Sequence, residues 1–125
     1  MNLNQVTIYS NKTTESIEFY EKLGLLLIVD SAPRYVRFEC PGGTSTLSVH
    51  ETDQTSQNPN IVLYFECRNL DEEVVRLKEL GFVFESDPID QSWHWREAYL
   101  KDPTGNRICL FFAGENRLNP PWRVK

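Results

Sequence analysis

The sequence predicts an α+β domain made of two consecutive βαβββ modules, and three observations support this fold class. Apolar helix positions recur at one constant spacing: Val74 lies 57 residues after Ile17, and Gly81 lies 57 residues after Gly24. The segments that follow the two helix patterns, KLGLLL and ELGFVF, are alike. Short stretches of alternating apolar and polar residues flank both helices, as half-buried strands do. A repeat that keeps its register through strand, helix and glycine indicates two copies of one unit.

The first module begins with a strand at Gln5–Tyr9, in which apolar and polar side chains alternate. Asn11–Thr14 interrupts this pattern and offers residues that cap a helix. Apolar residues then recur at helical spacing up to Gly24, which suits the position just after a helix. Turn residues separate the three further strands that we expect, at Leu25–Val29, Tyr35–Cys40 and Thr46–His50.

A polar segment without periodicity, Thr52–Asn60, is expected to link this module to the second one. The second module starts with a strand at Ile61–Cys67, and Asn69 with Glu72 predicts a capping box for the helix that follows. Gly81 is expected to end this helix. Three strands should complete the module, at Phe82–Glu85, Trp93–Lys101 and Arg107–Phe112.

The last two of these strands flank the turn Asp102–Asn106, which predicts a β-hairpin. Pro103 suits the first central position of a tight turn, and Gly105 tolerates a positive φ. After the strand Arg107–Phe112 the sequence no longer follows the repeat. The tail at residues 115–125 contains Pro120–Pro121, which favours polyproline geometry, and then Trp122. The tail is either a disordered end or a segment that docks through Trp122.

Length and charge narrow the class of protein. A chain of 125 residues is long enough for one domain with a real core. The net charge is −5 and no basic run occurs, so no nucleic-acid partner is expected. The longest apolar run, Leu25–Val29, is far too short to cross a bilayer, so no membrane partner is expected either. Three cysteines without a CxxC spacing favour free thiols in a reducing compartment, and hence a cytoplasmic location.

Three segments carry a resemblance to a known family: QVTIY near the start, SIEFYEKLGL at residues 16–25 and YLKDPTGNRICLF at residues 99–111. They resemble the glyoxalase/bleomycin-resistance/extradiol-dioxygenase group, the vicinal oxygen chelate superfamily. The resemblance implies a single glyoxalase-like domain over residues 1–114, with modules at about 3–52 and 60–113. It further implies a curled mixed sheet that forms a cup, helices on the outside, and a homodimer.

Metal-using members of that family bind a divalent ion with four strand residues, usually His, Gln or Glu. The resemblance projects these positions onto Gln5, Ser48, Val62 and Cys109. Only Gln5 is an ordinary ligand in this set, since Val62 has no donor atom and Ser48 is a poor neutral ligand. We therefore expect no metal cofactor. A register shift of one residue pair would replace Ser48 by His50, and a weak alternative site would then use Gln5, His50 and Glu97 for nickel, zinc, iron or manganese.

Strand alternation divides the side chains into two faces. The face that should pack under the helices is apolar: Val6, Ile8, Val36, Phe38, Leu47, Val49, Leu63, Phe65, Ala98, Leu100, Ile108 and Leu110. The opposite face is polar and aromatic: Gln5, Thr7, Tyr9, Tyr35, Arg37, Ser48, His50, Val62, Tyr64, Glu97, Tyr99, Arg107, Cys109 and Phe111. Such a face is either solvated or the lining of a ligand site.

We select as ligand-binding candidates ten residues: Gln5, Tyr9, Arg37, Ser48, His50, Tyr64, Trp93, Glu97, Tyr99 and Cys109. Individual roles stay open at this point. Glu97 is either a buried general base or, as we favour, the ion-pair partner of Arg37 or Arg107. Trp93, at the start of a strand, either covers a ligand or packs in a dimer. Cys109 is expected to be an inert buried thiol.

The sequence thus favours a protein on the bleomycin-resistance side of the family, metal-free and binding a small organic molecule in the sheet cup. The alternative is a divalent-metal-dependent lyase, isomerase or dioxygenase of the same superfamily. In either case we expect a homodimer, with Trp122 buried. No catalytic residue can be assigned.

Overall fold

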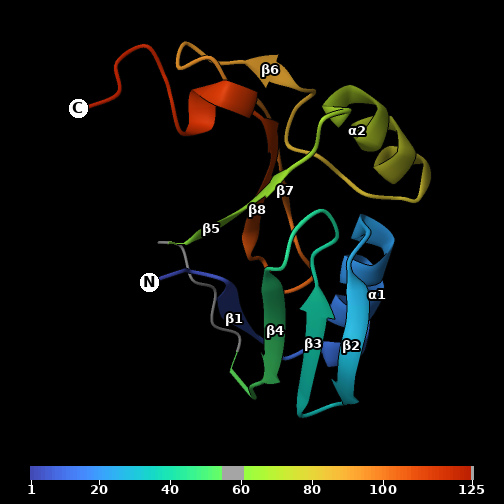
Figure 1. Cartoon of the computed structure of the whole chain (residues 1–125). Helices are drawn as coiled ribbons and strands as arrows, with labels where there is room; N and C mark the ends of the chain where they lie inside the picture. The colour runs from blue at the N-terminus through green and yellow to red at the C-terminus, as the bar shows by residue number, and fades with distance from the viewer. Residues whose placement is uncertain (55–60, 125) are drawn as a thin grey trace. The chain divides into compact units, whose positions relative to one another are not determined.

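The computed structural model describes residues 1–54 and 61–124, and the chain forms two compact units (Figure 1). Unit 1 comprises residues 1–58 together with Asp102–Gly105, and unit 2 comprises residues 59–101 and 106–125. Most of the predicted linker Thr52–Asn60 lies outside the described residues. None of the described helices is long and apolar enough to cross a membrane.

Unit 1 is a four-stranded sheet with one helix. Its elements are β1 (Gln5–Ser10), α1 (Thr13–Leu23), β2 (Leu26–Ser31), β3 (Tyr35–Glu39) and β4 (Thr46–Glu51). The strand order is β1-β4-β3-β2, with β1 and β4 parallel and the other pairs antiparallel.

Unit 2 repeats this plan and adds a short 3-10 helix. Its elements are β5 (Val62–Glu66), α2 (Leu70–Glu79), β6 (Ile89–Asp90), β7 (Arg96–Lys101), β8 (Arg107–Phe112) and η1 (Gly114–Arg117). The strand order is β5-β8-β7-β6, again with the first pair parallel. The order of elements and of pairing is the same in both units, so the predicted pair of βαβββ modules is confirmed. The cup that the resemblance implies stays a prediction.

The apolar face of each sheet packs under the helix of its own unit, as the alternation predicts. Of the twelve residues assigned to this face, ten are buried, and Val6 and Phe65 are partly buried. In unit 1 the fully buried Tyr20 of α1 lies with its ring centroid 5.9 Å from that of Phe38 on β3. In unit 2 the helix contributes Leu70, Val74 and Leu77 to the core.

The helix ends agree with the sequence only in part. Gly24 ends α1 with a φ of 120°, and its N–H donates to the carbonyls of Tyr20 and Glu21. Gly81 has a φ of 96° just after α2. The predicted capping box is wrong, because the Asn69 side chain makes no cap hydrogen bond. Asn69 has a ψ of 52°, outside the extended backbone that directs a capping side chain toward the first turn.

The strands before the last hairpin also differ from the prediction. Phe82–Glu85 forms no ladder and makes a single bridge, between Phe84 and Leu100. The sheet edge is instead the two-residue strand β6, which follows Pro88, a residue that cannot donate to a ladder. Residues 91–95 turn between β6 and β7, and the Gln91 N–H donates to the carbonyl oxygen of Trp95 with an N···O distance of 2.7 Å. Strand β7 therefore starts three residues later than expected.

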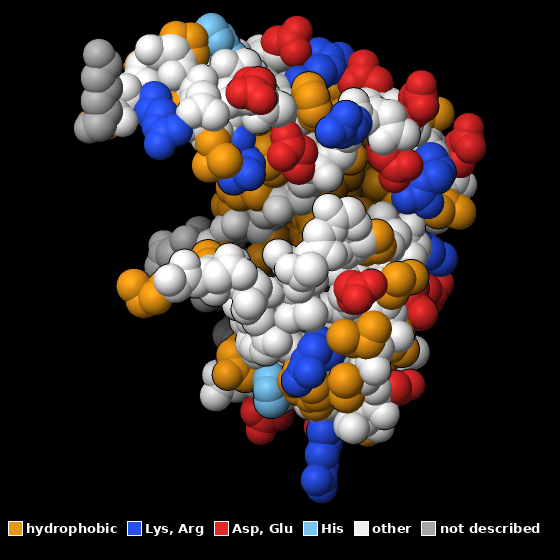
Figure 2. Space-filling model, in the orientation of Figure 1, with side chains coloured by type: hydrophobic (Ala, Val, Ile, Leu, Met, Phe, Trp, Pro, Cys, Tyr) orange, Lys and Arg blue, Asp and Glu red, His pale blue; other side chains and the backbone are white. Residues whose placement is uncertain are grey.

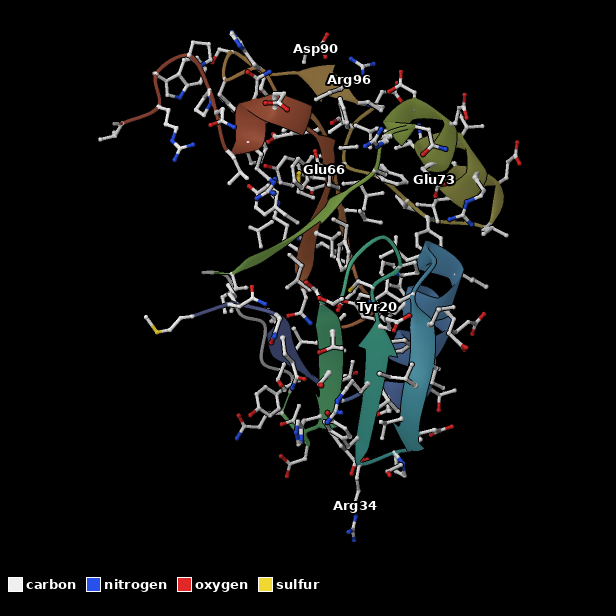
Figure 3. All side chains as sticks on the ribbon, viewed as in Figure 1. Tyr20, Arg34, Glu66, Glu73, Asp90 and Arg96 are labelled. Carbon is white, nitrogen blue, oxygen red and sulfur yellow. The ribbon has the colours of Figure 1, made fainter. Side chains whose placement is uncertain are left out.

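The predicted hairpin turn at Asp102–Asn106 is confirmed, and its first residue does more than start a turn. Asp102 accepts hydrogen bonds from the N–H and the hydroxyl of Thr104 on Oδ1, at 3.0 and 3.1 Å. Its other oxygen, Oδ2, accepts a hydrogen bond at 2.7 Å from the hydroxyl of Tyr20 on α1. Tyr20 is labelled in Figure 3. Burial, together with the nearby Asp102 charge, raises the pKa of Tyr20 well above its usual value.

The C-terminal segment is held by Glu66 at the end of β5 (Figure 3). Its Oε2 accepts the N–H groups of Ala113 and Gly114, both at 2.9 Å. Farther along, the Trp122 ring contacts His94 edge-on at 5.2 Å, while 55% of the residue remains exposed. The tail thus makes a local contact, and burial of Trp122 in a dimer stays a prediction.

Candidate functional site

Five of the ten candidate residues belong to unit 2, four of them on the sheet face opposite the apolar one and Trp93 in a neighbouring turn. Cys109 on β8 pairs with Tyr64 on one side and with Tyr99 on the other, so these three form one row across the sheet. In the next row Phe111 pairs with Glu97. Trp93 belongs to the turn between β6 and β7 and contacts Glu97.

Glu97 is the most unusual member of this group, because it is a carboxyl group that is only 3% exposed. Its Oε2 accepts a hydrogen bond from the Trp93 indole N–H at 3.2 Å, and its Oε1 accepts one from the Tyr99 hydroxyl at 3.3 Å. Both donors are neutral. Burial of a carboxylate among neutral groups is costly, which makes this position a candidate for function.

The expected ion pair between Glu97 and Arg107 does not form. The Arg107 guanidinium lies 4.0 Å from the centroid of the Tyr99 ring, and its Nε lies 3.4 Å from an oxygen of Glu85. On β8, Arg107 pairs with Lys101 and Val62, four residues along the strand from Phe111, which pairs with Glu97. Arg37, the other partner considered, belongs to unit 1.

Aromatic side chains surround this row. The rings of Trp95 and Phe111 stack with centroids 4.7 Å apart, and Tyr64 meets both rings edge-on at 6.0 and 5.5 Å. The Tyr64 side chain is nearly half exposed, whereas Phe111 is buried. Trp95 and Phe111 are absent from the ten candidates. Strand parity was the available signal for both: Phe111 has the parity of Cys109, and Trp95 has that of Glu97 in the predicted strand Trp93–Lys101. In the structure Trp95 lies in the turn just before β7.

Cys109 lies within a small apolar cluster with Phe111 and Ala113, against which Val62, Trp95 and Tyr99 pack. The thiol is fully buried, and burial with the nearby Glu97 charge raises its pKa to about 12. A thiol with such a pKa stays protonated near neutrality, so it is a poor nucleophile. Burial also raises the pKa of Tyr99, supported by its hydrogen bond to Tyr64.

Unit 1 carries a second polar group on the corresponding face. The Tyr35 hydroxyl lies 2.7 Å from Ser48 Oγ and accepts a hydrogen bond from Arg37 Nε at 2.8 Å. These two contacts, that with Ser48 first, lower the pKa of Tyr35. The His50 ring contacts Tyr35 at 4.8 Å and Tyr9 at 5.9 Å. The structure therefore brings Tyr9, Arg37, Ser48 and His50 together around Tyr35, which was not among the candidates.

Gln5 lies apart from this group. It pairs with Thr46, whose hydroxyl donates to Gln5 Oε1 at 2.9 Å, whereas His50 pairs with Tyr9. Four residues along a strand correspond to about 13 Å, so Gln5 and His50 are not adjacent. Glu97, the third member of the alternative metal set, belongs to unit 2. Within residues 1–54 and 61–124, no group of three or more His, Cys, Asp or Glu side chains could hold a metal ion.

The fold agrees with what the comparisons with known proteins find. The model of the Glyoxalase/Bleomycin resistance protein/Dioxygenase superfamily matches residues 2–110. The chain therefore belongs to this superfamily, and the resemblance noted in the sequence is confirmed. No curated protein matches the chain.

Solved structures show the same fold at low sequence identity. A glyoxalase/bleomycin resistance protein/dioxygenase from Nocardioides is 22% identical with a TM-score of 0.78, over 100% of this chain and 90% of that one. A lactoylglutathione lyase from Agrobacterium tumefaciens is 19% identical with a TM-score of 0.73, over 89% of this chain and 92% of that one. A glyoxalase/bleomycin resistance protein/dioxygenase family enzyme from Burkholderia phytofirmans PsJN is 20% identical with a TM-score of 0.75, over 90% of this chain and 99% of that one. At these identities the likeness concerns the fold.

Proposed function

We propose that this protein binds a small organic molecule without a metal, and that the polar-aromatic face of unit 2 makes the main contacts. The observation that carries the proposal is the buried carboxyl group of Glu97, which sits beside Trp93 and Tyr99 in an otherwise aromatic surrounding. A ligand site usually combines apolar and aromatic walls with a few fixed polar groups.

A solvated sheet face explains this arrangement less well. A solvated face needs no buried carboxyl group, and exposed positions there are tolerant of any polar residue. Here the carboxyl group is buried, while Tyr64 and Trp93 expose 48% and 43% of their surface. Fixed polar atoms behind partly exposed aromatic rings favour recognition of a ligand.

The donor atoms at the four positions given by the family resemblance support a metal-free protein. Val62 offers no donor, and the Ser48 hydroxyl is buried and hydrogen-bonded to Tyr35. Cys109 is a lone thiol packed among apolar side chains, and a single thiolate does not complete a site for a hard cation. Gln5 alone would then have to hold the ion, whereas a catalytic zinc site uses about three protein ligands. The residues present do not fit a divalent cation.

The name of one structural neighbour, a lactoylglutathione lyase, belongs to that protein, and 19% identity does not extend it to this chain. The alternative function, a divalent-metal lyase, isomerase or dioxygenase, is therefore kept as an outcome of the experiment. The three cysteines are free, which is compatible with the cytoplasmic location that we propose.

Two measurements on the untagged protein test the proposal. A thermal-shift screen against a broad library of small aromatic compounds, neutral and charged, should find compounds that raise the melting temperature by several degrees. Tyr64→Ala should weaken the binding of these compounds, whereas Val75→Ala, a truncation of an exposed residue on α2, should not. Elemental analysis should find no stoichiometric metal.

Two results would count against it. Stoichiometric nickel, zinc, iron or manganese in the purified protein would favour the enzyme. A library without any stabilising compound would remove the binding function.

A further inference from the structure

We propose that Glu97 anchors a subsite for a protonated amine or guanidinium group of the ligand, and that the Trp93 indole occupies this subsite when no ligand is bound. The inference rests on the proposed function, because it names the chemistry of a ligand on the same sheet face. It assigns a role to the buried carboxyl group of Glu97, which is not one of the four metal positions Gln5, Ser48, Val62 and Cys109 and which the alternative metal set would have used as a ligand.

The first argument is the count of donors at the carboxyl group. A carboxylate can accept about four hydrogen bonds. Glu97 receives one from Trp93 at 3.2 Å and one from Tyr99 at 3.3 Å, both longer than the most common N–H···O or O–H···O distance. Acceptor capacity is therefore left over on both oxygens. An ammonium or guanidinium group, which brings several N–H donors, would use it.

The second argument is charge. Both donors are neutral, so they leave the negative charge of Glu97 without a counterion, and a buried charge is stable mainly when it is paired. No ion pair reaches Glu97 from residues 1–54 or 61–124. A cationic ligand would supply the missing charge, and a neutral one of the same shape would not.

The third argument is that the neighbouring charged groups of unit 2 are engaged elsewhere. Arg107 is paired with Glu85 and lies over the Tyr99 ring. Glu66 lies in the same row of the sheet as Glu97, and its Oε1 is 3.7 Å from Arg117 Nε. Glu66 itself accepts two backbone N–H groups. A positive charge that pairs with Glu97 would therefore come from a ligand and not from Arg107 or Arg117.

The fourth argument is that Trp93 can leave. It lies in the turn between β6 and β7, is 43% exposed, and its indole is held to Glu97 by one hydrogen bond. Its neighbour His94 has a φ of 67°, in the left-handed region that non-glycine residues seldom adopt. A rotation of the indole out of the site would free Oε2, and the exposed part of the Tyr64 ring is available to the apolar part of a ligand. Aromatic rings next to a carboxylate also favour a cation directly.

The probe for this subsite is phenethylammonium, compared by isothermal titration calorimetry with its neutral counterpart 2-phenylethanol. We expect the cation to bind at least tenfold more tightly. Glu97→Gln keeps the size of the side chain and removes the charge, and it should abolish this preference. The matched control is Glu79→Gln, which removes the same charge from an exposed position on α2 and should leave both affinities unchanged.

Trp93→Phe gives an independent test, because the exposed position tolerates the change even if Glu97→Gln does not fold. It removes the competing N–H while keeping a ring, so phenethylammonium should bind about fivefold more tightly, as expected for the release of one modest hydrogen bond. Unchanged or weaker binding in Trp93→Phe overturns the role of the indole. Equal affinity for the two probes, or an unaltered preference in Glu97→Gln, overturns the subsite. If neither probe binds, the cation subsite is wrong, while hits in the neutral library would still support the proposed function.

Discussion

The hydroxyl of Tyr20 offers the sharpest test of how the first unit is held together. Tyr20 is completely buried and Asp102 is 5% exposed, and the 2.7 Å hydrogen bond between them joins α1 to the turn between β7 and β8. Tyr20→Phe removes the donor and keeps the ring that packs against Phe38. The substitution therefore isolates one hydrogen bond to a buried carboxylate.

The expected loss follows from the surroundings of Asp102. A hydrogen bond to a charged group contributes about 1.5–3 kcal/mol, and a buried acceptor that loses its donor keeps its desolvation cost. Thr104 still donates twice to the other carboxylate oxygen, so the turn itself should persist. We therefore expect a loss of about 2 kcal/mol in the free energy of unfolding.

Urea unfolding of the variant measures this loss. With an m-value of about 2 kcal/mol/M, the midpoint should fall by about 1 M. The control is Tyr64→Phe, because the Tyr64 hydroxyl is partly exposed and lies 3.5 Å from that of Tyr99. It should change the unfolding free energy by less than about 0.5 kcal/mol. If Tyr20→Phe shifts the midpoint no more than this control does, the buried hydrogen bond contributes nothing of note and the reasoning is wrong.

Three further predictions concern Cys109, Glu66 and the C-terminal tail. Burial raises the Cys109 pKa from 9.0 to about 12, so the thiol favours the folded state below pH 9 and loses this contribution as the pH rises to about 12. The free energy of unfolding of wild type minus that of Cys109→Ala, measured by urea unfolding, should decrease as the pH rises from 9 to about 12. A difference that stays constant with pH would contradict the raised pKa. Glu66→Gln weakens the hold on two backbone N–H groups, so the amides of Ala113 and Gly114 should exchange hydrogen about tenfold faster by NMR, while amides of α2 stay unchanged. Truncation after Gly114 should lower the melting temperature and weaken a homodimer, because the exposed Trp122 is the surface we expect the dimer to bury. Light scattering that shows a monomer at micromolar concentration, with unchanged melting, would exclude this role of the tail.

Local patterns were sufficient to predict the modules. The period of the apolar residues gives the helices, and alternation gives the faces of the strands, since both depend on backbone geometry alone. The predictions failed where a few residues could take either of two local structures. Phe82–Glu85 alternates like a strand, but the edge strand forms after Pro88 instead, at Ile89–Asp90. Asn69 precedes its helix as a cap would, yet its ψ of 52° turns the side chain away from that role.

The candidate site was predictable to the extent that strand parity decides it. Parity predicts that Tyr64, Tyr99 and Cys109 lie on one face, and the pairing of β8 with β5 and β7 places them in one row. What alternation cannot supply is the identity of a side chain's partner. The ion pair expected for Glu97 is replaced by a hydrogen bond from Trp93, a residue of the irregular turn between β6 and β7.

The Asp102 turn shows the same limit in its clearest form. The letters DPTGN predict a hairpin turn, and they do so because Pro103 and Gly105 restrict or permit particular backbone angles. The partner of the Asp102 side chain lies 82 residues earlier, on α1, and no local rule connects the two positions. Residues 102–105 belong to unit 1, although both flanking strands belong to unit 2. One short motif thus serves two modules: its backbone closes the hairpin of the second, and its carboxylate completes the hydrogen bonding of a buried tyrosine in the first.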